Sequence, residues 1–225
     1  MNTPQPSRWS ELFDMAISII DQANARGIDM HNWSFGGGTA LMLQIKHRDS
    51  HDIDIFINDP QYLPYLNPQT QDYDLVLGPN DYETDGFRAL KIVFEGVGEI
   101  DFICCDPVTR TPTVETKIRG RQVLLETPAE ILAKKIVFRG SHMQPRDMFD
   151  IAATSEALGR DYVIDALSAF PSECHAALNV AQRMNVRLVE AVTARLLVTK
   201  QFSQLRVSAQ EKTQDILAAA SSMSA

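Results

Sequence analysis

Helical and strand-like patterns of apolar residues alternate over the first 60 residues. Apolar residues at helical spacing, followed by a glycine, predict a helix over residues 10–26. A strand over 32–35 then leads into three glycines and a second helical pattern over 39–46. Residues 52–57 alternate between polar and apolar, which is the period of a strand. These segments predict a strand, a glycine turn, a helix and a returning strand.

The middle of the chain is expected to complete a sheet. Residues 61–86 are rich in Pro, Asn, Asp and Gln, and we expect a short helix, a strand near Leu75 and loops there. Two strands over 87–94 and 99–105 are predicted to form a hairpin, and residues 114–124 to form an edge strand.

The pattern becomes helical after residue 126. Thr127-Pro128-Ala129-Glu130 combines an N-cap hydroxyl, a proline at the first helical position and a glutamate at the third. Helices are predicted over 128–139, 146–158, 162–169, 171–184 and 186–199, with a last one from about 207. The order of elements predicts a mixed α/β (α+β) fold: a twisted sheet flanked by helices in residues 1–125, then a helical C-terminal domain in 126–225.

The composition is that of an ordinary globular protein. The 225 residues are 44% hydrophobic and 22% charged, which excludes a disordered chain, and three cysteines are too few for a disulfide scaffold. The start is polar and no apolar run reaches the roughly 18 residues of a membrane helix, so we expect a cytoplasmic protein with no membrane partner. The cysteines and histidines lack metal-site spacing, so we expect buried reduced thiols and surface or loop histidines. These residues include Cys104, Cys105, Cys174, His47, His51, His142 and His175.

The net charge of −8 hides two blocks of opposite sign. Residues 49–106 hold 13 acids and 2 bases, whereas residues 117–146 hold 7 bases and 2 acids. The basic block could attract an anionic substrate or nucleic acid, or each block could simply be a solvated face.

Asp52 and Asp54 are the first candidates for chemistry. Residues two apart on a strand point to the same face, so these carboxylates could converge on one cation. Two like charges about 4 Å apart repel by about 4 kcal/mol at an effective dielectric of about 20, so the pair needs a metal, a proton or a cationic neighbour. Oxygen ligands favour Mg²⁺ or Mn²⁺. The alternative is an exposed strand face whose acids are only solvated.

A glycine turn precedes this acidic pair. A helix that begins after Gly37-Gly38-Thr39 presents backbone N–H groups and a positive dipole end to an anion such as phosphate. A phosphate site beside a metal pair indicates phosphoryl or nucleotidyl transfer, whereas the glycines alone could be a plain tight turn. Asp101 is the candidate third acid, because an unpaired charge in its apolar strand would be costly to bury and so needs a partner such as a metal. Glu99 shares its face and competes for this role. The alternative is that Asp101 lies at the end of an edge strand in water.

Four charged residues of the helical half form a second candidate set. Lys135 and Arg139 share a helix face, and the acids of the next helix, Asp147 and Asp150, can pair with them. This arrangement is either the basic wall of a cleft or an interhelix network of salt bridges.

These motifs together resemble a known family. Residues 37–41 and 47–56 are similar to the signature of the AbiEii/AbiGii-type nucleotidyltransferases of the DNA polymerase β-like superfamily. Residues 135–140 and 146–151 resemble the downstream Lys/Arg and Arg/Lys-Asp-x-x-Asp segment of that family. Thr39 departs from the superfamily's second small residue but keeps a hydroxyl. The motifs lie within residues 35–151, and no motif is recognisable beyond residue 160.

The resemblance implies a nucleotidyltransferase-type sheet and transfer of a nucleoside monophosphate from a nucleoside triphosphate (NTP) to an acceptor hydroxyl. It implies Mg²⁺ or Mn²⁺ at Asp52, Asp54 and Asp101, with Lys135 completing the catalytic set. The residues that it assigns to the nucleotide are Gly37, Gly38, Thr39, Arg48, Ser50, Lys135 and Arg139, with Asp147 and Asp150 supporting the cations. Relatives act as toxins of toxin–antitoxin or abortive-infection systems, so an antitoxin and an acceptor such as tRNA or other RNA are implied partners.

Two other interpretations stay open. A module of the same fold could bind nucleotide or a partner protein without catalysis, although the intact Asp-x-Asp disfavours this. A kinase-like phosphotransferase would need a catalytic loop followed by Asp-Phe-Gly, and Asp-Phe-Gly is missing from the sequence.

Overall fold

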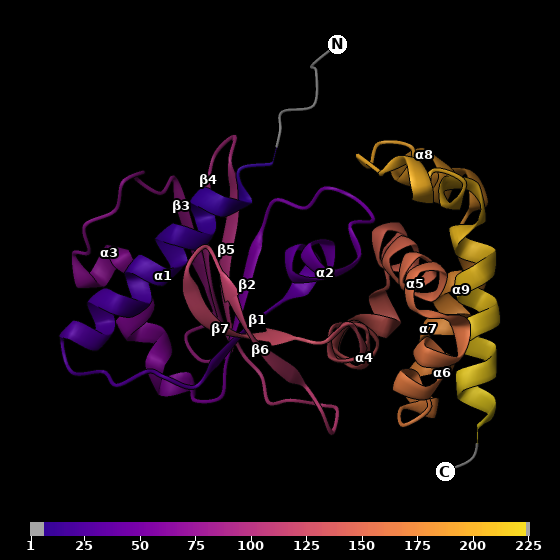
Figure 1. Ribbon diagram of the computed structural model, residues 1–225, viewed down its shortest axis with the longest axis horizontal. Coiled ribbons are helices and arrows are strands. Elements are labelled where there is room, and N and C mark those ends of the chain that lie inside the picture. Colours follow the sequence, from indigo (N-terminus) through magenta and orange to yellow (C-terminus); the bar gives the residue numbers. More distant parts are fainter. Residues whose placement is uncertain (1–6, 224–225) are drawn as a thin grey trace. The chain divides into compact units, whose positions relative to one another are not determined.

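A computed structural model describes residues 7–223, and its contacts divide them into two units (Figure 1). The first unit comprises the described residues up to Ala40, Ser50–Pro107 and Thr113–Glu126, and the second comprises Leu41–Asp49, Val108–Pro112 and the residues from Thr127 onward. The domain boundary expected at residue 125 stays a prediction, and the contacts group two earlier segments with the later helices.

A mixed sheet of seven strands is described in the first unit, which confirms the predicted fold class. The strands are β1 (Trp33–Gly36), β2 (Ile53–Ile57), β3 (Asp81–Thr84), β4 (Ala89–Phe94), β5 (Gly98–Cys104), β6 (Thr113–Ile118) and β7 (Arg121–Glu126). Their spatial order is β3-β4-β5-β2-β1-β7-β6. Strand β2 is parallel to β5 and β1 is parallel to β7, whereas the other neighbouring pairs are antiparallel.

Two strand predictions were wrong. Residues 114–124 form the β6–β7 hairpin rather than one edge strand, because Arg119 and Gly120 both have positive φ and turn the chain back. The strand expected near Leu75 is absent from the described residues, and β3 follows later. In the apolar run of residues 75–77, Val76 is fully exposed, so its side chain is not packed as it would be in a strand of a sheet. Residues before it form the short helices η1 (Pro60–Leu66) and α3 (Pro68–Gln71).

Helix α1 (Trp9–Ala25) covers the apolar face of the sheet (Figure 1). Its buried residues recur at helical spacing and are Leu12, Phe13, Met15, Ala16, Ile19, Ile20 and Ala23. On β2, buried Ile53, Ile55 and Ile57 alternate with partly exposed Asp54 and Phe56. This alternation places Asp54 on the opposite, polar face, where the candidate site lies.

Helix α2 (Gly37–Ile45) begins two residues earlier than predicted, so Gly37 and Gly38 belong to the helix. The later helices are α4 (Pro128–Arg139), η2 (Gly140–His142), α5 (Pro145–Leu158), α6 (Arg160–Leu167), α7 (Pro171–Arg183), α8 (Val186–Thr193), η3 (Lys200–Phe202) and α9 (Leu205–Ser222). Helix α4 begins as predicted, and the Thr127 hydroxyl accepts a hydrogen bond from the Glu130 N–H at 3.2 Å. Helix α8 ends six residues earlier than predicted, because Val198 instead forms a β-bridge with Arg48.

Helix α9 packs along α5 and α7 (Figure 1). Part of this core consists of Phe149, Ala152, Ala153, Phe202, Leu205 and Ala209. None of the helices in residues 7–223 combines the length and the apolar character needed to span a membrane.

The three cysteines are free of disulfides, as expected. Cys174 is buried, but Cys104 and Cys105, at the end of β5, are only partly buried, so their predicted burial was wrong.

Candidate active site

Asp54 and Asp101 are brought together by the register of two parallel strands. Asp54 of β2 is paired with Asp101 of β5, so both side chains point to the same face of the sheet. The row continues to Lys91 of β4 beyond Asp101, and to Gly36 of β1 beyond Asp54. We call Asp54, Asp101 and Lys91 the acid row. Two carboxylates and one ammonium group thus lie on neighbouring strands.

Asp52 directly precedes β2 and is fixed by two hydrogen bonds. Its carbonyl oxygen accepts a hydrogen bond from the Thr39 hydroxyl at 2.5 Å, and its Oδ1 accepts one from the Glu99 N–H at 3.1 Å. Thr39 is buried. The resemblance assigned Thr39 to the triphosphate. In this structure its hydroxyl fixes Asp52, the residue that precedes β2.

Lys91 offsets only part of the cost of a negative charge on Asp101. Burial and the charge of Asp54 raise the pKa of Asp101 to about 7, although Lys91 opposes the shift. Asp54 and Asp101 offer only oxygen ligands, and their mutual repulsion is only partly offset. Such a pair fits a hard cation such as Mg²⁺ or Mn²⁺. Within residues 7–223, no three His, Cys, Asp or Glu side chains form a ready metal-binding group. Metal binding by Asp52, Asp54 and Asp101 therefore stays a prediction.

The start of α2 lies against Asp54. Gly37 has a φ of +68°, and a Cβ at this position would overlap with the Asp54 carboxylate. Glycine is thus required both for the left-handed backbone and for the close approach. The positive end of the α2 dipole, with the N–H groups of its first turn, consequently begins beside the acid row.

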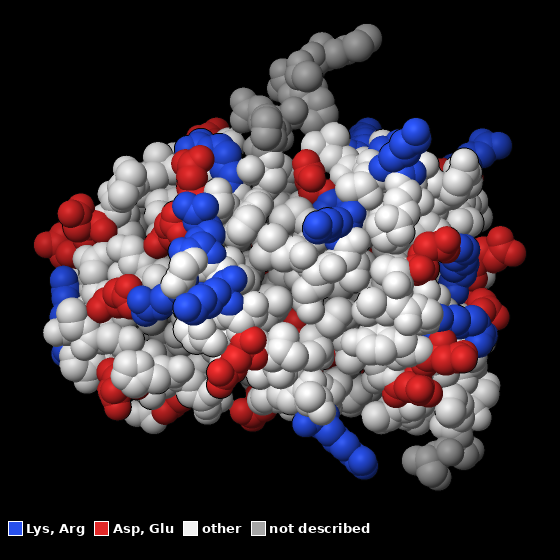
Figure 2. All heavy atoms as spheres, viewed as in Figure 1, with Lys and Arg blue, Asp and Glu red and all other residues white. Residues whose placement is uncertain are grey.

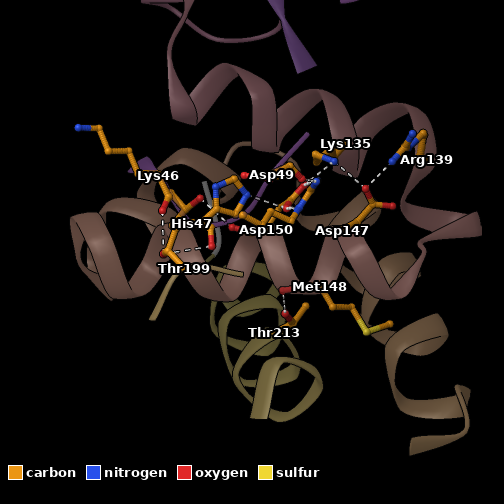
Figure 3. A network of polar contacts seen from close by, with 12 residues as sticks. Lys46, His47, Asp49, Lys135, Arg139, Asp147, Met148, Asp150, Thr199 and Thr213 are labelled. Carbon is orange, nitrogen blue, oxygen red and sulfur yellow. Dashed lines mark hydrogen bonds and ion pairs between the residues drawn. The ribbon is translucent and has the colours of Figure 1, made fainter. Parts of the chain in front are cut away.

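Lys135 of α4 lies between two carboxylates of α5 in the second unit (Figure 3). Its Nζ is 2.7 Å from Asp147 Oδ1 and 3.0 Å from Asp150 Oδ2. Arg139 also pairs with Asp147. Arg48 binds Asp150 through Nε and Nη2, at 2.7 and 2.9 Å. The predicted pairing of the α4 cations with the α5 acids is confirmed.

Both carboxylates of this Lys135 cluster are ionised although they are buried. Burial opposes ionisation, but the charges of Arg48 and Lys135 outweigh it and hold the pKa of Asp150 well below its ordinary value. Lys135 and Arg139 likewise lower the pKa of Asp147 against the effect of burial. Three cations thus face two carboxylates, so the cluster keeps a positive charge.

His47 is fully buried, so its predicted surface or loop position was wrong. Its Nε2 lies 2.9 Å from Asp150 Oδ1, and its ring stacks on Phe149 (Figure 3 shows the imidazole and Asp150). Burial lowers the pKa of His47, although Asp150 opposes the shift. Since an ionised carboxylate only accepts, the neutral ring carries its hydrogen on Nε2. Nδ1 has no hydrogen-bond partner within the described residues.

The basic block of residues 117–146 is largely paired with acids from elsewhere in the chain. Arg119 pairs with Asp14, and Arg121 with Asp21, both on α1. On the face shown in Figure 2, basic and acidic side chains lie beside one another. Of the remaining predicted nucleotide-binding residues, Ser50 is buried and its carbonyl oxygen accepts a hydrogen bond from the Ser7 hydroxyl at 2.5 Å.

Lys91 was missed by the sequence analysis. It is one of the two bases in the acidic block, and the alternation of residues 89–94 already places it on the polar face of the predicted hairpin. That pattern could have indicated its position beside Asp101.

Comparison with known proteins decides the family. The profile of the family described as "Nucleotidyl transferase AbiEii toxin, Type IV TA system" matches residues 19–220. The chain belongs to this family. The match confirms the resemblance inferred from the motifs. As an AbiEii nucleotidyltransferase toxin of a type IV toxin–antitoxin system, the protein has, in general terms, a nucleotide substrate and a cognate antitoxin.

Two solved structures from Helicobacter pylori are similar to this AbiEii-family chain. JHP933 has 13% sequence identity and a TM-score of 0.48, with 96% of this chain and 94% of that chain covered. A candidate nucleotidyltransferase has 14% identity and a TM-score of 0.47, with 92% and 93% covered. No curated protein matches the chain.

Proposed function

We propose that the protein transfers a nucleoside monophosphate from an NTP to an acceptor hydroxyl, with Mg²⁺ or Mn²⁺ as the metal. The observation that carries this proposal is the meeting of three features at one place: Asp54, Asp101 in register with it, and the start of α2 at Gly37. Carboxylates beside a helix N-terminus suit a metal-bound triphosphate.

The acidic residues have the first role. Asp52, Asp54 and Asp101 would hold the metal, which when bound would neutralise phosphate charge and orient the reacting groups. The N–H groups of Gly37, Gly38 and Thr39 would bind phosphate oxygens. The acceptor oxygen then attacks the α-phosphorus, the bond from this phosphorus to its bridging oxygen breaks, and pyrophosphate leaves. A carboxylate of the site takes the hydroxyl proton.

The Lys135 cluster has the second role. Lys135 and Arg139 would place positive charge on the triphosphate, with Arg48 and Ser50 contributing on the nucleotide side. The support for this assignment is the positive charge that the cluster keeps and the fixed orientation that Asp147 and Asp150 impose on the cations. Such preorganised charge is worth more than the same charge on a mobile side chain.

The acceptor is proposed to be RNA, with tRNA as the first candidate. This assignment rests on the family resemblance and leaves protein or small-molecule acceptors as outcomes of the test. The cognate antitoxin would be the protein partner, as in the type IV systems of this family.

The test supplies the protein with each of the four α-³²P-labelled NTPs, Mg²⁺, and total RNA or total protein. We expect label in RNA with one or more nucleotides, and none with Asp54→Asn or with the double variant Asp52→Ala/Asp54→Ala. Glu95→Gln is the matched control, because Glu95 is an exposed carboxylate in the turn between β4 and β5. Equal labelling by the wild type and the Asp54 variant would refute the proposed mechanism.

A further inference from the structure

We propose that Lys91 is a site residue: a built-in counter-ion that holds Asp101 and competes with the divalent cation for the acid row. This inference rests on the proposed function, because it concerns the same carboxylates.

The position of Lys91 follows from strand register. Lys91 on β4 is paired with Asp101 on β5, which is paired with Asp54 on β2, so all three side chains point to the polar face. The Lys91 Nζ lies 3.5 Å from Asp101 Oδ2 and forms a closer ion pair with Glu99. Its neighbours Leu90 and Ile92 are buried on the other face and fix the strand.

Glu99 and Asp101 therefore have different roles, although both were candidates for the third acid. Glu99 holds the ammonium group to one side of the row, whereas Asp101 faces both Asp54 and Lys91. A cation that is tethered in this way offsets part of the repulsion between the two aspartates when no metal is bound. The same positive charge repels an incoming divalent cation, so Lys91 sets the affinity of the row for metal.

The test measures Mn²⁺ binding to the full chain without nucleotide, from the electron paramagnetic resonance signal of free Mn²⁺. We expect Lys91→Met to bind Mn²⁺ about tenfold more tightly than the wild type, from removal of one partly screened charge. Lys91→Arg keeps the charge and should bind like the wild type. Lys117→Met, at an exposed lysine of β6, is the matched control and should also leave binding unchanged.

A second variant moves the affinity in the opposite direction. Glu99→Gln releases the Lys91 ammonium group toward Asp101 and Asp54, so we expect Mn²⁺ binding several-fold weaker than in the wild type. Since Glu99→Gln also removes a carboxylate, the double variant Glu99→Gln/Lys91→Gln separates the two effects: it should bind Mn²⁺ more tightly than Glu99→Gln alone if Lys91 acts on the row. This comparison decides the matter if Lys91→Met does not fold.

Two failures can be told apart. Binding of Mn²⁺ that depends on Asp54 but is unchanged in Lys91→Met or Glu99→Gln would overturn the role of Lys91 alone. Absence of Asp54-dependent Mn²⁺ binding in all variants would overturn the metal site itself, and with it both proposals.

Discussion

Asp54 and Asp101 stand opposite each other on neighbouring parallel strands, so that two carboxylates share one row of the sheet. Burial and this proximity raise the pKa of Asp101 to about 7, which shows how poorly the row tolerates two negative charges. The proposed metal site needs both carboxylates, whereas the stability of the metal-free protein favours fewer negative charges in the row.

Asp54→Asn should separate these two demands. We expect nucleotidyl transfer to fall by at least about 100-fold, because a proposed metal ligand is lost. The melting temperature without metal should stay the same or rise by about 2–4 °C, which corresponds to about 1 kcal/mol of relieved repulsion. Activity assays and thermal unfolding followed by circular dichroism measure the two quantities. A variant that is less stable and equally active would contradict both expectations.

Gly37→Ala should damage the site through sterics. The control is Gly96→Ala, because Gly96 also has positive φ (+72°) but has open space around it among the described residues. We expect Gly96→Ala to lower the free energy of unfolding by about 1 kcal/mol, the ordinary cost of a left-handed non-glycine residue. Gly37→Ala should cost a further 1–3 kcal/mol or so, because its Cβ overlaps with the Asp54 carboxylate. It should also lose activity, and equal effects of the two substitutions would refute the close approach.

Asp150→Asn should destabilise the second unit strongly. The substitution removes the anion that Arg48 and Lys135 share in a buried position, and such losses cost about 3–5 kcal/mol. Asp215→Asn breaks an exposed ion pair with Arg160 and should leave the stability nearly unchanged, because solvent screens this pair. Denaturant unfolding of both variants measures the difference. Similar small losses would show that the buried carboxylate is not needed by its cations.

His47 should make the stability of the protein depend on pH. Burial holds the folded-state pKa of His47 below its ordinary value of 6.5, so the unfolded chain binds the proton first. The free energy of unfolding therefore falls as pH drops through about 6.5, and His47→Gln should lose this component.

The measurement is denaturant unfolding of wild type and variant between pH 5 and 8. The raised pKa of Asp101 has the opposite effect on stability in both proteins, so the difference between the two curves isolates His47. His175→Gln, at an exposed position on α7, should follow the wild-type curve. Parallel curves for wild type and His47→Gln would mean that His47 does not titrate differently in the folded state.

Local pattern determined much of this protein from the sequence by itself. The period of apolar residues located α1 and β2, and Thr127-Pro128 located the start of α4. Spacing along two helices was enough to pair Lys135 with the acids of α5. Each of these features depends on residues a few positions apart, or on a motif that the family shares.

Only the tertiary structure decided which distant residues meet. The sequence analysis named Asp101 as a candidate and missed Lys91, whereas the strand order and register placed both in one row with Asp54. His47 is buried because residues 47–49 pair with residues 197–199: the Thr199 N–H donates to the His47 carbonyl oxygen at 3.1 Å. Such pairings are fixed by long-range packing and hydrogen bonding, which the period of a local segment does not encode.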